Sequence, residues 1–360
     1  MAADLTELKT QDGYTWLNDI NSQVLQQALR NLDTAYNRFF KHQARFPTFK
    51  SKHKNQSFHI PQHFKYQNGY LKIPKLKSCI KINIPKKDRM ELTQDNINSL
   101  TISKTKSGEY YVSFLVEVDH EPLPVNSNVV GIDLGLTNLI VINDGTKSTV
   151  IQNPKFLKKN EKKLKELQRS LSRKKKGSKN REKARIKLAE KHSYIERCRN
   201  DNIHKLTKKI TDENQVIICE DLNIQQLMKK DYYNNAQGIQ DAAWGEITRQ
   251  LKYKSEWKGR IYLEVDRYFA SSKICNHCGH KHCGLELKDR FWICQNCHAN
   301  NDRDINAAKN IRDQGLADLI SEGLWDIAPR ICGDLEGPQD ASLVESSKSL
   351  KQEAAAFMQR

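Results

Sequence analysis

Apolar residues near the start of the chain recur at the spacing of a helix. Leu17, Val24 and Ala28 begin a series that continues to Phe39, which makes one face of a helix from Trp16 to Phe40 apolar. Ser22 is placed to cap a turn inside this helix. Residues 1–45 are therefore predicted to form an N-terminal segment built on one amphipathic helix.

Residues 46–125 show a different pattern, in which short apolar segments are separated by prolines. Four prolines lie between 47 and 85, and Asn68-Gly69 has the composition of a tight hairpin turn. Further on, Tyr110, Val112 and Phe114 alternate with residues of the opposite face, as in a half-buried strand. This region is predicted to be a β-rich module, and a small barrel is its expected form.

Strand-like and helix-like segments alternate between residue 126 and Ile311, which is typical of a mixed α/β domain. The periodicity fades past Arg312, and Gly, Pro, Ser and Gln dominate from Gly333 onward. Residues 316–360 are therefore expected to be a disordered tail. The chain is predicted to be multidomain and to mix α/β and all-β parts.

Positive charge is concentrated in one part of the chain. The 360 residues hold 60 Lys and Arg against 43 Asp and Glu, a net charge of +17, and residues 155–209 alone hold 22 basic and 6 acidic residues. Their sparse apolar seam is compatible with two helices that meet at Arg173–Lys179. A solvated surface hairpin is one interpretation. The basic excess favours contact with nucleic-acid phosphates, through Arg173, Lys174, Lys175, Lys176, Lys179 and Arg181.

Composition also excludes several classes of protein. No run of 18 apolar residues is present, and the first residues lack the pattern of a signal peptide, so neither a membrane partner nor secretion is expected. Four of the nine cysteines form two Cys-x-x-Cys pairs, which indicates thiolates kept reduced for a metal. A cytoplasmic location is therefore expected.

Three acidic positions stand at the ends of predicted elements. Asp133 lies within an apolar strand, where an unpaired charge is costly, so a cation or a structural hydrogen bond must satisfy it. Strand 216–219 ends in Glu220-Asp221, and alternation places only one of these two acids on a given face without showing which. Asp302 can cap the helix that follows it. Asp304 lies in the first turn of that helix, where the helix dipole favours an anion in any case.

Three such carboxylates suit Mg²⁺, which prefers oxygen ligands. Phosphodiester hydrolysis needs an activated water and a stabilised leaving oxygen, and two Mg²⁺ ions about 4 Å apart supply both. On this hypothesis Asp133 bridges the two ions, Glu220 holds the ion on the attacking side, and Asp304 holds the other.

The two Cys-x-x-Cys pairs form the most specific spacing in the sequence. Cys275-Asn-His-Cys278 and Cys294-Gln-Asn-Cys297 are separated by 15 residues, which is the spacing of a structural, tetrahedral Zn²⁺ site. Redox pairing is the alternative, and Cys283 or the neighbouring histidines His277, His280, His282 and His298 could replace one ligand. All four positions are filled by Cys, so this metal is expected to fold a short ribbon and not to catalyse.

Taken in order, these motifs resemble those of the TnpB family, the OrfB-type proteins of bacterial insertion sequences, which are similar to type V CRISPR effector nucleases. The resemblance runs from about Trp16 to Ile311. It is carried by Gly131-Ile-Asp133-Leu-Gly135, Cys219-Glu220-Asp-Leu-Asn223, Trp244 to Lys254, Trp257-Lys-Gly259, Ser271 to Gly279, and Asp302-Arg-Asp304-Ile-Asn306-Ala-Ala308.

The resemblance implies a RuvC-like nuclease domain of ribonuclease H fold at 126–270, which contains the basic hairpin 155–209. A zinc ribbon at 271–300 and a last helix at 301–315 complete it. A wedge-type β-barrel at 46–125 precedes it, with 1–45 as the remnant of a helical recognition insertion. The family's three acids match Asp133, Glu220 and Asp304. The implied partners are a guide RNA from the transposon end and a double-stranded DNA target.

One departure from the family pattern concerns the N-terminus. Only 15 residues precede Trp16, where family members have a short strand and further helices. Either the barrel lacks its first strand, or the true start of the protein lies upstream of Met1. The expected function is Mg²⁺-dependent, RNA-guided cleavage of DNA. A truncated regulator that binds nucleic acid without cutting is one alternative, and a guide-free RuvC-like nuclease is another.

Overall fold

The structure is a computed structural model that describes residues 2–51, 56–85, 92–229, 236–286 and 288–321. Its internal contacts divide the chain into two units. Met1–Asp119 and Lys163–Tyr194 form the first, and His120–Lys162 and Ile195–Arg360 form the second. The family resemblance placed the whole basic hairpin in the nuclease domain, whereas the internal contacts group Lys163–Tyr194 with the first unit.

The N-terminal segment holds more than the one helix predicted from the apolar pattern. Helix α1 (Ala2–Leu8) and a 3-10 helix η1 (Thr15–Asp19) precede α2 (Ser22–Phe40). The Asn21 side chain caps α2 by accepting a hydrogen bond from the amide of Gln23. The prediction of one helix from Trp16 with Ser22 as its cap was therefore wrong, because the apolar spacing continues across a break that the Asn21 cap imposes.

Two antiparallel sheets form the rest of the first unit up to residue 119. The larger sheet has the order β1-β5-β6 (Gln56–Ile60, Ile97–Lys104, Tyr110–Val116), and the smaller has the order β2-β3-β4 (Lys65–Gln67, Tyr70–Lys72, Ile80–Lys81). Asn68 and Gly69 both have positive φ and join β2 to β3, which confirms the predicted turn. Ile60, Leu71 and Leu100 are buried in the one core that both sheets share. The module is β-rich as predicted, while its closure into a barrel stays a prediction.

The basic hairpin consists of α4 (Phe156–Ser172) and α5 (Lys179–Glu213), joined by a turn in which Gly177 has a φ of 83°. This confirms the predicted pair of helices and their break.

The second unit is built on a five-stranded mixed sheet with the order β11-β10-β7-β8-β9. Strand β7 (Val129–Leu134) is antiparallel to β8 (Asn138–Asn143), which is antiparallel to β9 (Ser148–Gln152). Strands β10 (Val216–Glu220) and β11 (Ile261–Val265) run parallel to β7. A strand buried on both faces is apolar throughout, which is why Val216–Cys219 contains no polar alternation.

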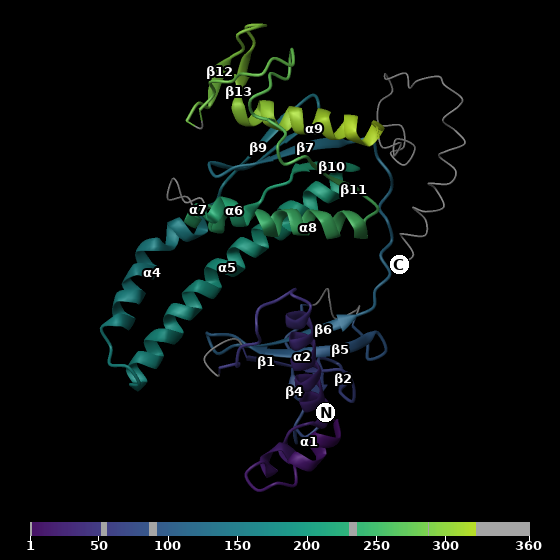
Figure 1. The fold of residues 1–360 in the computed structure, drawn as a ribbon, viewed down its shortest axis with the longest axis vertical. Helices are drawn as coiled ribbons and strands as arrows, with labels where there is room; N and C mark the ends of the chain where they lie inside the picture. The colour runs from purple at the N-terminus through teal and green to yellow at the C-terminus, as the bar shows by residue number, and fades with distance from the viewer. Residues whose placement is uncertain (1, 52–55, 86–91, 230–235, 287, 322–360) are drawn as a thin grey trace, which may run out of the picture. The chain divides into compact units, whose positions relative to one another are not determined.

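Helices cover both faces of this sheet (Figure 1). One face packs against α5, α7 (Ala236–Ala242) and α8 (Trp244–Trp257), with Ile217 and Cys219 of β10 in that core. The other face packs against α9 (Arg303–Ser321), with Ile218 in that core. A short helix α6 (Ile224–Lys229) follows β10.

The segment after β11 forms a small ribbon and then α9. Strands β12 (Phe291–Ile293) and β13 (Asn300–Asp302) pair antiparallel, and α9 follows at once. Helix α9 extends to Ser321, so the predictions of a last helix ending at 315 and of disorder from 316 were wrong for 316–321. Leu319 is buried against the sheet and supplies the tertiary contact that the fading periodicity concealed. The rest of the predicted tail, 322–360, lies outside the described residues. None of the described helices is long and apolar enough to cross a membrane.

Candidate active site

Two of the predicted acids lie side by side because their strands are parallel and in register. The pairing of β10 with β7 matches Val216 to Val129 and Cys219 to Ile132, so the next residues in the same register are Glu220 and Asp133. Neighbouring residues of a sheet point to the same face. Both carboxylates therefore belong to the face that α9 covers, at the carboxyl ends of the two strands.

The packing of α9 brings the third acid to the same place. A Cβ built on Gly131 would lie 2.2 Å from the carbonyl oxygen of Ala308, so α9 crosses β7 in direct backbone contact there. From Ala308 back to Asp304 is one helical turn, about 6 Å. From Gly131 forward to Asp133 is two strand residues, about 6.6 Å. These two steps are similar in length, so the first turn of α9 lies over the end of β7.

The electrostatics of the site agree with this placement. Burial raises the pKa of Asp133 well above its usual range, and the charges of Glu220 and then Asp304 raise it further. Burial also raises the pKa of Glu220, although a hydrogen bond from the hydroxyl of Ser271 acts in the opposite direction. Carboxylates that repel one another in a partly buried site form a strong field for a cation.

Asp304 has two partners that the sequence patterns did not reveal. Arg290, from the ribbon, donates from Nη1 to Oδ1 of Asp304 at 3.2 Å, and Asn138, at the start of β8, donates to Oδ2 at 3.1 Å. Arg290 is 51% exposed in its side chain, against 15% for Asp304. The apolar periodicity does not single out either residue. Arg290 is one of several basic residues in a loop, and Asn138 has the composition of a polar turn position.

The two acids that competed for these roles have other partners. Asp221 forms an ion pair with Arg267. Asp302 caps α9, since its Oδ1 accepts a hydrogen bond from the amide of Ile305 at 3.0 Å, as its position before the helix predicted.

The four cysteines of the two Cys-x-x-Cys pairs converge. Their sulfur atoms lie within 4.8 Å of one another, with 3.7 Å between Cys275 and Cys297 and 3.6 Å between Cys278 and Cys294. A disulfide would need about 2.05 Å. A tetrahedron with Zn–S bonds of about 2.3 Å has edges of about 3.8 Å, so this set fits Zn²⁺. Gly279 has a φ of 73°, as the expected turn requires.

Hydrogen bonds tie the first cysteine loop to α9. The amides of Asn306 and Asn310 both donate to the carbonyl of Ile274 at 2.7 Å, and the Asn276 backbone amide donates to Asn306 Oδ1 at 3.0 Å. Asn306 lies two residues after Asp304. The ribbon therefore holds the helix that presents the third carboxylate.

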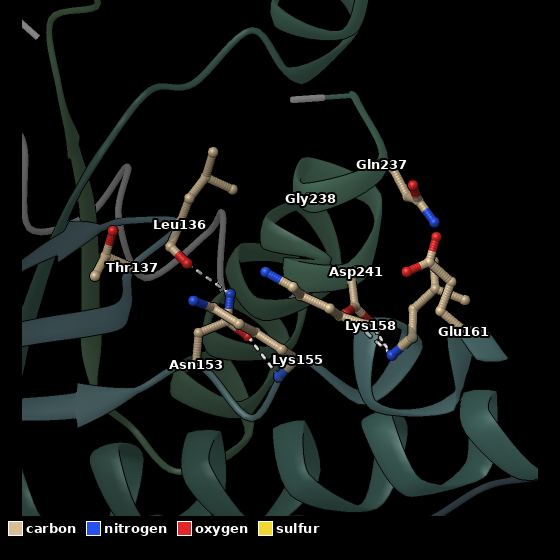
Figure 2. Close-up of a pocket in the computed structure, with 10 residues that line it drawn as sticks. Leu136, Thr137, Asn153, Lys155, Lys158, Glu161, Gln237, Gly238 and Asp241 are labelled. Carbon is tan, nitrogen blue, oxygen red and sulfur yellow. Dashed lines mark hydrogen bonds between the residues drawn. The ribbon is translucent and has the colours of Figure 1, made fainter. Parts of the chain in front are cut away.

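A cavity of about 360 Å³ opens beside the β7–β8 connection (Figure 2). Lys155 and Lys158 line it, and the buried carboxylate of Asp241 accepts hydrogen bonds from the amide of Leu157 at 3.0 Å. Thr137 also lines the cavity, and its hydroxyl lies 3.5 Å from Nη2 of Arg290. Thr137 is thus shared between this cavity and the group around Asp304.

The predicted phosphate-binding residues lie in and after the turn between α4 and α5. Arg173, Lys175, Lys176 and Lys179 are exposed, and Lys174 is half-buried. Arg181 differs from them, because its Nη1 donates to the carbonyls of Leu171 and Lys174 at 2.8 and 2.9 Å. Arg181 therefore closes the end of α4, whereas the side chains of the other five predicted residues have no such described contact with the end of this helix.

A chain in one solved structure has a similar fold. The cryo-EM structure of the Cas12f1-sgRNA-target DNA complex contains a chain that matches this one with a TM-score of 0.52 and 16% identity, over 87% of this chain and 75% of that chain. The α/β and β modules described above thus have the fold of Cas12f1.

Family models and relatives identify the family. The OrfB_IS605 model, described as "Probable transposase", matches residues 113–231, and the "Cas12f1-like, TNB domain" model matches residues 244–311. A "Putative RNA-guided DNA endonuclease" from Streptomyces pristinaespiralis is 38% identical over 98% of this chain and 83% of its own length. The "Putative RNA-guided DNA endonuclease InsQ" from Escherichia coli (strain K12) is 32% identical over 100% and 86%. The chain belongs to the TnpB family.

Proposed function

We propose that this chain, a member of a family of insertion-sequence RNA-guided DNA endonucleases, cleaves its DNA target with the carboxylates of Asp133, Glu220 and Asp304. The observation that carries the proposal is their convergence on one sheet edge, where burial and mutual repulsion raise the pKa of Asp133. The strand order supports a RuvC-like ribonuclease H unit, since β7, β8 and β9 are antiparallel neighbours, β10 pairs in parallel with β7, and β11 pairs in parallel with β10.

The donor set suits Mg²⁺, because it consists of oxygen ligands whose repulsion a divalent cation relieves. Two bound Mg²⁺ ions would supply the activation of water and the stabilisation of the leaving oxygen. Asp133, Glu220 and Asp304 would hold these ions.

Arg290 and Asn138 position Asp304 while no cation is bound. A guanidinium on Asp304 Oδ1 neutralises this carboxylate, and the exposure of Arg290 leaves it free to turn toward a phosphate when a cation takes its place. The ribbon, held by Zn²⁺ on Cys275, Cys278, Cys294 and Cys297, would set the position of Arg290.

The turn between α4 and α5 and the lysines of the Thr137 cavity would bind the phosphates of the nucleic acids. The guide would be an RNA from the transposon end, and the target double-stranded DNA.

Cleavage by protein purified from cells that carry its own flanking DNA tests this function. The co-purified RNA is sequenced, and a plasmid programmed by that RNA is incubated with Mg²⁺. Ala at Asp133, Glu220 or Asp304 should abolish cleavage while RNA and DNA binding persist.

Asp221→Ala is the matched control, because this acid neighbours Glu220 in sequence but pairs with Arg267. It should retain cleavage. Cleavage by Asp133→Ala would remove Asp133 from the site, and binding without programmed cleavage by the wild-type chain would favour a regulator that does not cut.

A further inference from the structure

Net charge conceals a second basic region in the first unit. Residues 34–87 hold 13 Lys and Arg and no Asp or Glu, although residues outside 155–209 are nearly neutral in sum. Nine of these cations lie in the described part of the chain, and all nine are exposed. Like charges that repel one another across a small module are stabilised by an external polyanion.

Exposed aromatic rings accompany these cations. Phe40, Phe46 and Phe49 follow one another along the basic segment, and their exposed fractions are 68%, 60% and 100%. Basic residues interleaved with exposed rings are the composition of surfaces that bind single-stranded nucleic acid, where cations follow the backbone and rings stack on bases.

The β1-β5-β6 sheet contains a groove with this chemistry. It measures about 370 Å³ and is lined by Phe58, Tyr110, Lys50 and Lys104 with three serines, and none of the described residues that line it is acidic. Phe58 is 41% and Tyr110 68% exposed.

Strand register explains why these groups share the groove. Phe58 is paired with Ile102, and Lys104, two residues further along β5, is paired with Tyr110. Phe58, Ile102, Lys104 and Tyr110 therefore belong to one face of the sheet. The ammonium of Lys104 lies 5.3 Å from the centre of the Tyr110 ring. The apolar core of the module ends here, and the aromatic and basic groups continue its face into solvent.

We propose that this groove binds an unpaired nucleotide of a single strand, whose base stacks on Tyr110 and Phe58 while Lys50 and Lys104 contact its phosphates. The Tyr110 ring is 68% exposed, so its position is not explained by packing in the core. None of the described residues that line the groove is acidic, which suits an anionic strand. This site extends the proposed function, because it assigns part of the nucleic-acid contact to a place far in sequence from the carboxylates.

Photocross-linking tests the site without relying on cleavage. Full-length Asp133→Asn protein, without added Mg²⁺, is irradiated with 12-nucleotide oligouridine or oligothymidine that carries one 5-iodopyrimidine. Adducts mapped by mass spectrometry are expected on Tyr110 or Phe58. Adducts confined to other segments, such as the turn at Arg173–Lys179, would overturn the proposal.

Binding of the same oligonucleotides, measured by fluorescence anisotropy over a range of salt, provides the second readout. Tyr110→Ala should weaken binding between about fivefold and 100-fold, the range for loss of one stacked base, without changing the salt slope. Tyr110→Phe should restore binding. Tyr111→Ala is the matched control, because this neighbour belongs to the opposite face of the strand.

Each further outcome has a defined meaning. A loss confined to oligouridine identifies the occupant as RNA, and a loss confined to oligothymidine identifies it as DNA. Unchanged binding by Tyr110→Ala, or an equal loss in Tyr111→Ala, would refute the site. None of these readings depends on the catalytic acids, so the proposed cleavage and this site can fail independently.

Discussion

Gly315 of α9 provides a sharp test of how the third carboxylate is positioned. A Cβ built on Gly315 would lie 2.4 Å from Cγ2 of Ile218 in β10, and 2.9 Å and 3.0 Å from its Cδ1 and Cγ1. Carbon atoms in contact are normally about 3.5–4.0 Å apart. Gly315→Ala therefore requires α9 and the sheet to separate by about 1 Å, or Ile218 to leave its rotamer.

Two opposing free-energy terms decide the outcome. Replacing Gly by Ala within a helix should stabilise it by about 1 kcal/mol. Overpacking a filled core costs about 1–3 kcal/mol, and a clash of this depth belongs at the upper end. The expected net destabilisation is about 2 kcal/mol, and the melting temperature should fall by about 4–8 °C for a unit of this size.

The rate of cleavage should fall by more than the loss of folding stability alone would cause. Asp304 lies on the same helix, and a displacement of about 1 Å at a catalytic group can cost about 100-fold in rate. The assay is a thermal melt together with Mg²⁺-dependent cleavage, measured below the melting temperature of the variant.

Two further variants separate the clash from other effects. Gly238→Ala in α7 is the matched control, since its Cβ would meet Leu136 at 3.6 Å, which is an ordinary contact, so its stability should rise or stay unchanged. Ile218→Ala removes the opposing atoms, so Gly315→Ala should cost less in its presence. A Gly315→Ala protein as stable and as active as wild type would refute the packing of α9 described above.

Four more predictions concern the charges and metals. Burial and neighbouring charges raise the pKa of Asp133, so the folded protein loses stability as the pH rises through that pKa and Asp133 ionises. Without Mg²⁺ at pH 8, Asp133→Asn should therefore have a higher melting temperature than wild type, and Mg²⁺ should no longer stabilise the variant. A lower metal-free melting temperature would contradict this. Cys294→Ser should lose bound zinc, measured by elemental analysis, whereas Cys283→Ser, outside the four-cysteine group, should keep it. Arg290→Ala should lower the cleavage rate by about 10–100-fold with little change in DNA affinity, because it removes a group that holds a metal-binding carboxylate; unchanged single-turnover rates would exclude a role in the site. Neutralising Arg173–Lys176 should reduce the slope of log affinity against log salt by about 0.9 per lost phosphate contact on DNA. An unchanged slope would mean that this turn is a solvated surface that does not contact phosphates.

Much of the fold could be predicted because its signals are local. The apolar run Val216–Cys219, the sparse seams of α4 and α5 and the Asn68-Gly69 turn each depend on residues close in sequence. The Cys-x-x-Cys pairs are equally local, since each loop fixes its two thiolates by itself. The errors fell at boundaries, where a cap at Asn21 ended a continuing pattern and where packing of Leu319 prolonged α9.

The candidate site needed contacts between distant residues. Strand register placed Glu220 beside Asp133, and the close approach of α9 at Gly131 carried Asp304 to them. Periodicity gives the face of a strand but not the neighbour of that face, so the sequence alone left Glu220 and Asp221 open until the family resemblance selected Glu220. Arg290 and Asn138 carried no local signal, because their role exists only through Asp304.

Charge shows the same division. The sequence by itself determined that residues 155–209 hold most of the net charge and that two cysteine pairs have zinc spacing. Only the tertiary structure showed that Arg181 closes a helix end and that Phe58, Tyr110 and Lys104 line one groove. The physical reason is that composition sums charges along the chain, whereas binding depends on which groups the fold leaves exposed on a common face.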